Sequence, residues 1–179
     1  MNLDKIRDDL LLLDKPELLI INEIDADEYY YVAKSLEFLI TRNSPNLIIK
    51  IDSCGGKVRA SLNIYDAIRL YRGKKIGIVA ANAASMAAVI LQACDQRCCT
   101  EHGHILIHHI NLSIDLCHLQ NEVKCDQIIK EMELEQESIF KIFIAKTGKN
   151  RSVIKKECAK NTAMSAEEAL RFGLIDKII

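Results

Sequence analysis

One serine stands in an alanine-rich stretch where its hydroxyl could do chemistry. Residues 80–90 read AANAASMAAVI, in which six of the eleven residues are alanine and Ser85 carries the single hydroxyl. Serine is a mediocre helix former, and a hydroxyl in a packed alanine run gains little without a partner. The small neighbours leave room for a substrate carbonyl, so Ser85 is a candidate nucleophile. The alternative is that Ser85 only caps the helix that follows it.

A serine nucleophile needs hydrogen-bond donors for the developing oxyanion and a base for its proton. The first N–H groups of the helix after Ser85 are unpaired and are one source of donors. The Gly55-Gly56 pair is a second source, because a backbone without side chains approaches a substrate closely. His108 follows the apolar run Ile105–Ile107 and is the candidate base. The adjacent His109 is expected to face the other way.

The elements that would position these residues alternate along the chain. Strands are predicted at 18–21, 47–51, 76–80, 97–100, 104–108 and 174–179. Helices are predicted at 3–13, 25–41, 84–94, 116–147 and 152–160, and from Ser165 to Gly173. A further helix is predicted after Gly56, with Ala60, Ile64, Tyr65 and Ile68 on one face. The apolar strand 47–51 should be covered on both faces. The alternation predicts an α/β fold with a largely parallel sheet, whose strands present both site loops at their carboxyl ends.

Composition limits the class of protein. The chain has 179 residues, enough for one domain, and its formal net charge of −1 gives no electrostatic case for nucleic acid. We find no apolar run of the roughly 20 residues that a membrane span needs. The N-terminal MNLDKIRDDLLLLDK is too acidic for a signal peptide, and seven cysteines then indicate a reducing compartment. We therefore expect a cytoplasmic protein.

A group of cysteines and histidines could be read as a metal site. It comprises Cys94, Cys98, Cys99, His102 and His104. Cys98 and Cys99 are adjacent, so a strand would point them to opposite faces, and the spacing of the group is poor for a metal. We expect neither a metal nor another cofactor.

Several dispersed blocks resemble the proteolytic subunit of the Clp protease family, over residues 9–179. The blocks are IIKIDSCGG (48–56), ANAASMAAVIL (81–91), HILIHH (104–109), KTG (146–148) and MSAEEALRFGLIDKII (164–179). Several blocks in the right order are more specific than any one motif. The resemblance implies a single domain over 1–179 with the crotonase-like fold of repeated ββα units and a long handle helix. It places an N-terminal helix at 1–14 and a handle-like insertion at 111–148.

The same resemblance implies a serine peptidase that degrades polypeptides. Ser85 matches the nucleophile, His108 the general base, and the N–H groups of Gly56 and Met86 the oxyanion hole. Gly55 and Gly56 match the substrate-binding loop. The family assembles into rings, usually two stacked heptamers, fed by an ATPase of the AAA+ type. We therefore expect self-association, an AAA+ unfoldase and a polypeptide substrate as partners.

The third member of the catalytic triad departs from the family, because Asn161 stands where an aspartate is usual. An asparagine carbonyl can hold the histidine tautomer, but the stabilising charge is lost. Asn161 therefore predicts a weakened or conditional peptidase. Asp126 and Asp115 are alternative acids that no spacing supports. The other interpretation of Asn161 is a helix-terminal cap.

Further departures concern the loops. Cys54 replaces the proline before the glycine pair, and Ala87 replaces the glycine after Ser-Met. The segment INLSIDLCHLQNEV after His109 lacks glycine and is longer than usual, which puts ring–ring contact and substrate binding in doubt. The family's axial segment is not evident before the helix at 3–13, which puts docking of the usual ATPase in doubt.

Two alternatives remain open. The chain could be a non-catalytic or weakly active subunit of a mixed ring, which assembles but reacts poorly with a fluorophosphonate. It could also be an acyl-CoA enzyme of the crotonase fold, whose melting temperature a CoA thioester would raise. A peptidase with a histidine base should lose activity below the ordinary histidine range, about pH 6–7.

Overall fold

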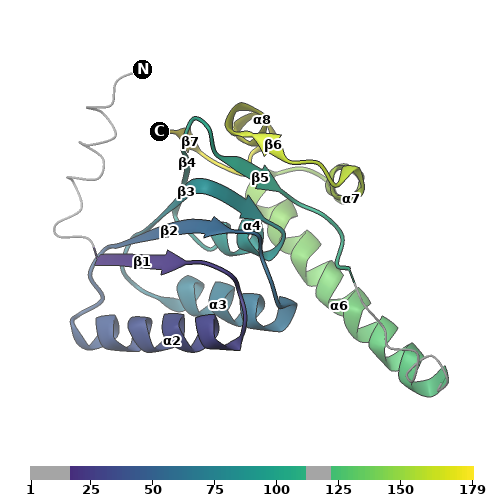
Figure 1. Cartoon of the computed structure of the whole chain (residues 1–179), viewed down its shortest axis with the longest axis horizontal. Coiled ribbons are helices and arrows are strands. Elements are labelled where there is room, and N and C mark those ends of the chain that lie inside the picture. The colour runs from purple at the N-terminus through teal and green to yellow at the C-terminus, as the bar shows by residue number, and fades with distance from the viewer. Residues whose placement is uncertain (1–16, 112–121) are drawn as a thin grey trace.

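The computed structural model describes residues 17–111 and 122–179, which form a sheet with helices on it (Figure 1). The strands are β1 (Glu17–Ile21), β2 (Leu47–Ser53), β3 (Lys75–Ala84), β4 (Gln96–Cys99), β5 (His104–Leu106), β6 (Met164–Ser165) and β7 (Lys177–Ile178). The helices are α2 (Ala26–Thr41), α3 (Val58–Leu70), α4 (Met86–Leu91), α6 (Glu122–Thr147), α7 (Arg151–Lys160) and α8 (Ala166–Phe172). The expected helix at 3–13, the 1–14 segment and the first part of the 111–148 segment lie outside the described residues.

The sheet confirms the predicted parallel arrangement. Strands β1, β2, β3, β4 and β7 lie side by side in that order and pair in parallel, while β6 pairs antiparallel with β5. Strand β3 changes its partner along its length, since residues 76–79 pair with β4 and residues 82–84 pair with β5. A register shift between Ile51 and Ser53 of β2 accompanies this change. Such irregularities redirect side chains near functional sites.

Two helices have the N-terminal caps that their sequences predict. The side chain of Asp25 accepts a hydrogen bond from the N–H of Glu28 at 2.9 Å. The carboxylate of Glu28 accepts instead from Asn22, so only half of a capping box forms. At α8, Ser165 and Glu168 form the complete capping box.

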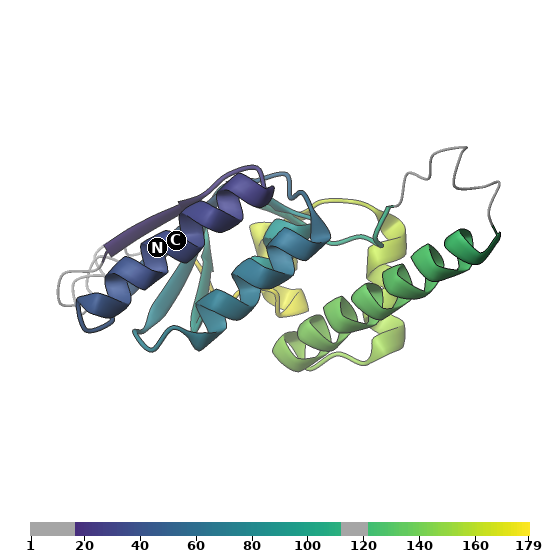
Figure 2. The same ribbon diagram turned by 90° about the horizontal axis from the view of Figure 1, so that it is seen from below.

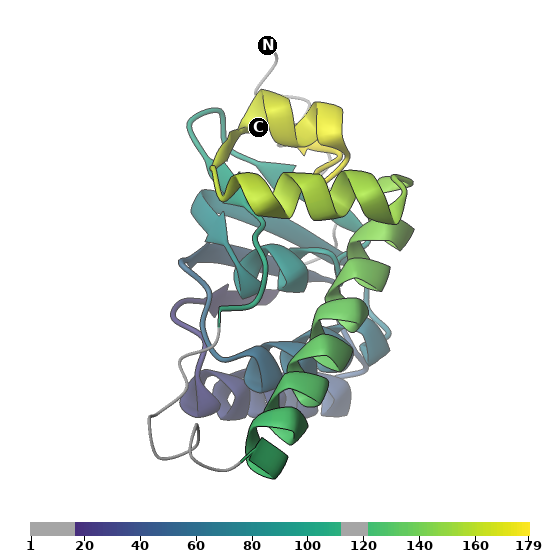
Figure 3. The same ribbon diagram turned by 90° about the vertical axis from the view of Figure 1, so that its right-hand side faces the viewer.

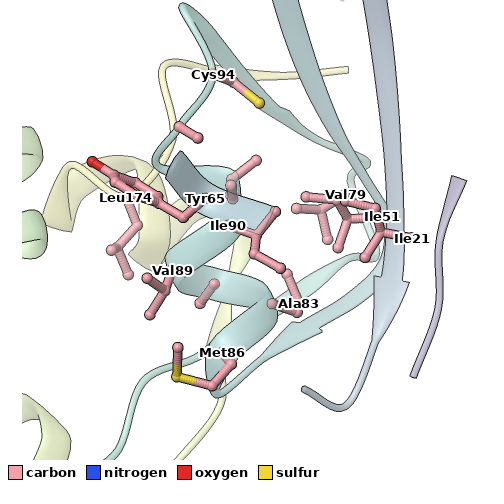
Figure 4. Close-up of a cluster of buried hydrophobic side chains, with 14 of the residues drawn as sticks. Ile21, Ile51, Tyr65, Val79, Ala83, Met86, Val89, Ile90, Cys94 and Leu174 are labelled. Carbon is pink, nitrogen blue, oxygen red and sulfur yellow. The ribbon is translucent and has the colours of Figure 1, made fainter. Parts of the chain in front are cut away.

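Helices α2 and α3 run beside each other across one face of the sheet (Figure 2). The short helix α4 is buried along its whole length. Its Val89 and Ile90 pack with Ile51, Val79 and Tyr65 in the core (Figure 4). Burying each such aliphatic side chain stabilises the fold by roughly 1.5–3 kcal/mol. Ser85, the residue before α4, is therefore attached to a helix that is packed on all sides.

The expectation that the 47–51 strand is covered on both faces is wrong. Lys50 and Asp52 of β2 are exposed, because the helices pack mainly on the opposite face of the sheet. Among the described residues, a small second cluster around Ile76 and Cys98 lies on this open face. Cys99 belongs to the main core, so adjacent cysteines do point to opposite faces, as expected.

Helix α6 extends away from the sheet, and α7 packs across it near its carboxyl end (Figure 3). The predicted helix at 152–160 is confirmed as α7, and the 165–173 helix as α8, which Gly173 closes in a left-handed conformation. The predicted 84–94 helix is shorter, because β3 continues to Ala84 and α4 ends at Leu91. No helix in the described ranges is long and apolar enough to cross a membrane.

Candidate active site

Ser85 adopts a strained conformation between β3 and α4. Its φ of 56° and ψ of −122° lie in a region that residues with a side chain rarely occupy. Such strain costs roughly 1–3 kcal/mol and clusters at active sites. Ser85 stands at the N-cap position, yet its side chain makes no capping hydrogen bond. The alternative that the Ser85 hydroxyl only caps the helix is therefore not supported.

The two glycines lie against the Ser85 turn, and each needs its missing side chain. Gly55 has a φ of +98°, and a Cβ there would lie 2.8 Å from the Ala84 oxygen and from the Ser85 Cβ. Gly56 has a φ of +154°, and its Cβ would lie 2.0 Å from the Ile24 oxygen. Only glycine allows both the positive φ and the close approach. The Gly-Gly pair after the strand therefore reflects two close contacts, that of Gly55 with the Ser85 turn and that of Gly56 with Ile24.

Main-chain hydrogen bonds hold this glycine loop to the segment after β1. The N–H of Ile24 donates to the Gly55 oxygen at 3.0 Å, and the N–H of Lys57 donates to the Ile24 oxygen at 2.7 Å. Met86 is the first residue of α4, so its N–H has no acceptor within the helix. The loop and the helix start therefore present backbone N–H groups next to Ser85 from fixed positions.

His108 lies in an extended segment beyond β5, which ends at Leu106 rather than at residue 108 as expected. Its Nδ1 atom is buried and has no hydrogen-bond partner among the residues that the structure describes. The regular strand ends before both histidines, and the opposite orientation of His108 and His109 stays a prediction. Both histidines line the same pocket, and the His109 ring lies edge-on to Phe140 at 5.7 Å.

One pocket of about 210 Å³ contains most of the candidate site residues. Its lining comprises Gly56, Val58, Ser85, Met86, Val89, His108, His109, Ile110, Asn111, Ile139 and Phe143. The candidate nucleophile, the candidate base and both oxyanion-hole candidates thus come together from the start of α4, from the glycine loop and from the segment after β5. Apart from His109 and Asn111, the rest of the wall comes from the apolar residues Val58, Val89, Ile110, Ile139 and Phe143, so the pocket suits an apolar group of a substrate.

Asn161 is not among the residues that line this pocket. It ends α7 in a left-handed conformation with φ 50° and ψ 41°, its N–H donates to the Cys158 oxygen, and its side chain is exposed. Asparagine tolerates the left-handed conformation well, and Asn161 occupies the C-cap position of α7, as the helix-cap interpretation predicted. Asp126 is exposed on α6 and does not line the pocket either, and Asp115 lies outside the described residues.

Comparison with known proteins identifies the family. The model of the Clp protease family matches residues 4–179. The chain belongs to the Clp protease family. It is 31% identical over 172 residues to the ATP-dependent Clp protease proteolytic subunit 1 of Protochlamydia amoebophila, covering 94% of this chain and 82% of that protein. It is 28% identical to the protein of the same name from Chlamydia muridarum, covering 96% and 90%. The proteolytic subunit of Carsonella ruddii is 30% identical, covering 83% and 75%.

In this Clp family chain, helix α6 supplies part of the site that sequence reasoning missed. Ile139 and Phe143 line the pocket, Phe140 contacts His109, and Gln136 accepts a hydrogen bond from the N–H of Ile110 at 2.8 Å. These four α6 residues are spaced i, i+3, i+4 and i+7, so they share one face of the helix. The sequence shows this spacing, but it does not show that this face of α6 packs against the segment that contains His108, His109 and Ile110.

Two cysteines of the candidate metal group in this Clp family chain, Cys94 and Cys99, are poor metal ligands in their surroundings. Burial raises the pKa of Cys94 to about 12 and that of Cys99 to about 11. The thiolate is the form that binds metals, and burial disfavours it here. Within residues 17–111 and 122–179, no three histidine, cysteine or carboxylate side chains are arranged to hold a metal ion.

Proposed function

We propose that this chain is the serine endopeptidase subunit of a Clp-type ring protease that degrades unfolded proteins or peptides. Ser85 is the nucleophile, His108 the general base, and the N–H groups of Gly56 and Met86 form the oxyanion hole. The main support for this proposal is that one pocket is lined by all four residues, and that Ser85 has a strained main-chain conformation. The relatives' names as proteolytic subunits support the same reaction class.

The proposed reaction proceeds by acyl transfer. His108 takes the proton of the Ser85 hydroxyl as the serine oxygen bonds to the substrate carbonyl carbon, and the two N–H groups bind the resulting oxyanion. The C–N bond then breaks, and His108 gives the proton to the leaving amine. Water, with His108 again as base, hydrolyses the acyl-enzyme and restores the serine.

Asn161 is assigned the third triad position, with a role narrower than that of an aspartate. Its side-chain carbonyl is suited to accept the Nδ1–H of His108, which fixes the tautomer without stabilising the charged imidazolium. In the single chain the Nδ1 atom is unpartnered among the described residues and Asn161 is exposed. These two observations favour a peptidase that is weak or conditional on assembly. They also favour a second candidate, an activity-poor member of a mixed ring.

The proposed partners are further copies of this subunit, in stacked heptameric rings, and an AAA+ unfoldase. The relatives are named ATP-dependent, which supports an ATPase partner. The chain also exposes large apolar side chains, including Leu70 at 82% and Leu134 at 70% exposure. Exposed apolar surface of this kind marks protein–protein contacts. The proposed location is the cytoplasm.

Intact-mass labelling with a fluorophosphonate, with size-exclusion chromatography alongside, tests the function. A single adduct on the wild-type chain that is absent from Ser85→Ala is expected. Ser35→Ala removes a half-buried hydroxyl on α2 that does not line the pocket, and it should keep the adduct. A well-assembled ring that shows no adduct would refute the peptidase assignment in favour of the scaffold subunit, and a monomer at micromolar concentration would refute the ring.

A further inference from the structure

The segment that carries the candidate base is fixed at both ends by main-chain hydrogen bonds. On one side, the Leu106 oxygen accepts from the N–H of Ser85 at 2.8 Å. On the other, the N–H of Ile110 donates to the Oε1 atom of Gln136 at 2.8 Å. His108 lies midway, two residues from each anchor. The first anchor comes from the nucleophile itself and the second comes from α6.

The imidazole of His108 lacks the orienting contact that a triad acid supplies. Its buried Nδ1 atom has no partner among the described residues. A base whose side chain is not oriented relies on its main chain to stay near the nucleophile. Small displacements of a catalytic group lower reaction rates strongly, because the reacting atoms must be aligned within a few tenths of an ångström. The Ile110 anchor is therefore more important here than in a complete triad.

The same face of α6 makes several contacts with this segment and its pocket. Phe140, one turn after Gln136, contacts the ring of His109, and Ile139 and Phe143 form the pocket wall. Gln136 is the member of this face with a hydrogen bond to the segment's main chain. Its Nε2 atom is buried without a partner among the described residues, which carries a desolvation cost.

We propose that Gln136 is a positioning residue for the proposed peptidase, and this role depends on that function. Its amide oxygen holds Ile110, and through it keeps His108 beside Ser85. The apolar wall does not depend on this hydrogen bond. Loss of the acceptor should therefore slow the chemical step without weakening the binding of an apolar substrate group.

Gln136→Met tests this role, because methionine keeps the length of the side chain and removes the strong acceptor. We expect the fluorophosphonate labelling rate and kcat to fall about tenfold while KM stays within about twofold, as for one lost hydrogen bond. The melting temperature and the oligomer size should not change. Glu133→Met, an exposed substitution one turn earlier on α6, should leave all rates unchanged.

Gln136→Glu is the matched rescue, since a carboxylate keeps an acceptor for the N–H of Ile110. It should restore the labelling rate to within about threefold of wild type at pH 8. It should also move the acid limb of the activity profile to higher pH, because a nearby carboxylate favours protonated histidine. The pH shift reports that residue 136 lies near His108, and the restored labelling rate is the result that tests the positioning role.

The outcomes separate the two proposals. Wild-type labelling with an unchanged rate in Gln136→Met overturns the positioning role alone, and so does a Gln136→Glu variant as slow as Gln136→Met. No adduct on any chain, wild type included, overturns the peptidase function. If Gln136→Met lowers the melting temperature, Gln136→Ala provides the same comparison with a smaller side chain, and a normal labelling rate in that variant overturns the role.

Discussion

The main-chain N–H of Ser85 donates to the carbonyl oxygen of Leu106 at 2.8 Å, which joins the candidate nucleophile to the strand that leads to the candidate base. This bond continues the pairing of β3 with β5, in which Ala84 lies opposite Leu106. Sheet register thus fixes Ser85 against Leu106, two residues before His108. Removal of the serine hydroxyl leaves this bond intact, so Ser85→Ala should change reactivity without changing the geometry of the site.

Gly56→Ala should abolish fluorophosphonate labelling. The new Cβ would lie 2.0 Å from the Ile24 oxygen, so the loop that presents the oxyanion-hole N–H must move. Gly148→Ala is the matched control, because Gly148 also has a positive φ, of +67°, but nothing lies within 4 Å of its Cβ position. That control should lower the free energy of unfolding by roughly 1–2 kcal/mol and keep the labelling. Equal labelling of both variants would contradict a role for Gly56 in the site.

The order of strands and helices could be predicted from the sequence because apolar periodicity and capping residues are local signals. The apolar runs at 47–51 and 76–80 predicted two strands, which are neighbours in the sheet. Ser165 with Glu168 predicted the start of α8. The prediction for strand 47–51 was wrong on one point, since Lys50 is exposed. Local hydrophobicity does not tell which faces of a sheet the helices cover.

The sequence predicted those parts of the site that short, continuous stretches of the chain form. The Gly55-Gly56 pair and Ser85 follow directly on strands, whereas the contribution of Gln136 and Phe140 depends on how α6 packs against residues 108–110. That packing is a contact between distant segments, which one sequence does not reveal. The predicted end of the strand before His108 was also wrong, because strand β5 ends at Leu106, two residues earlier than its apolar pattern indicates.

Asn161→Asp should raise kcat on a fluorogenic peptide, by about tenfold or more, if Asn161 fills the third triad position. A carboxylate holds the same tautomer and also stabilises the imidazolium. Asn161→Ala should lower kcat, because the acceptor is lost. Asn150→Asp is the control, since Asn150 caps the other end of α7 and aspartate caps equally well. Identical kcat values in all four chains would show that Asn161 acts only as the helix C-cap.

The Arg97–Asp176 ion pair should make stability depend on pH in the acid range. Burial alone would raise the pKa of Asp176, but hydrogen bonds from the Arg97 main chain, at 2.8 Å, and guanidinium outweigh it and lower the pKa below 3.8. A lowered folded pKa means that the stabilisation is fully present above about pH 4. This stabilisation is lost as the pH falls from the ordinary pKa of an aspartate, which applies in the unfolded chain, through the lower pKa of Asp176 in the folded protein.

Urea unfolding of wild type and Asp176→Asn from pH 7 to pH 3 measures this effect. At pH 7 the variant should be about 1–2 kcal/mol less stable, a loss limited by the partial exposure of the carboxylate. The difference should narrow below about pH 4, where the carboxylate takes up a proton. Asp52→Asn, an exposed change on β2, should follow the wild-type curve. A difference that stays constant down to pH 3 would contradict the lowered pKa.

Alkylation of Cys54 should block the site. Cys54 is exposed beside the glycine pair, with its Sγ atom 3.7 Å from the side-chain nitrogen of Asn82. Cys94 is buried with a pKa of about 12, so at pH 8 only about one thiol in ten thousand is ionised there. We expect iodoacetamide at pH 8 to modify Cys54 and spare Cys94, as followed by peptide mass mapping.

The adduct should lower fluorophosphonate labelling of Ser85, because it adds bulk next to Gly55, which lies directly against the serine. Cys54→Ser is the decisive control, since other cysteines of the chain can also react. That variant should label normally with the fluorophosphonate both before and after iodoacetamide. Loss of labelling in Cys54→Ser after alkylation would assign the block to another cysteine. Full labelling of alkylated wild type would show that substrate does not approach Ser85 along the Cys54 side of the loop.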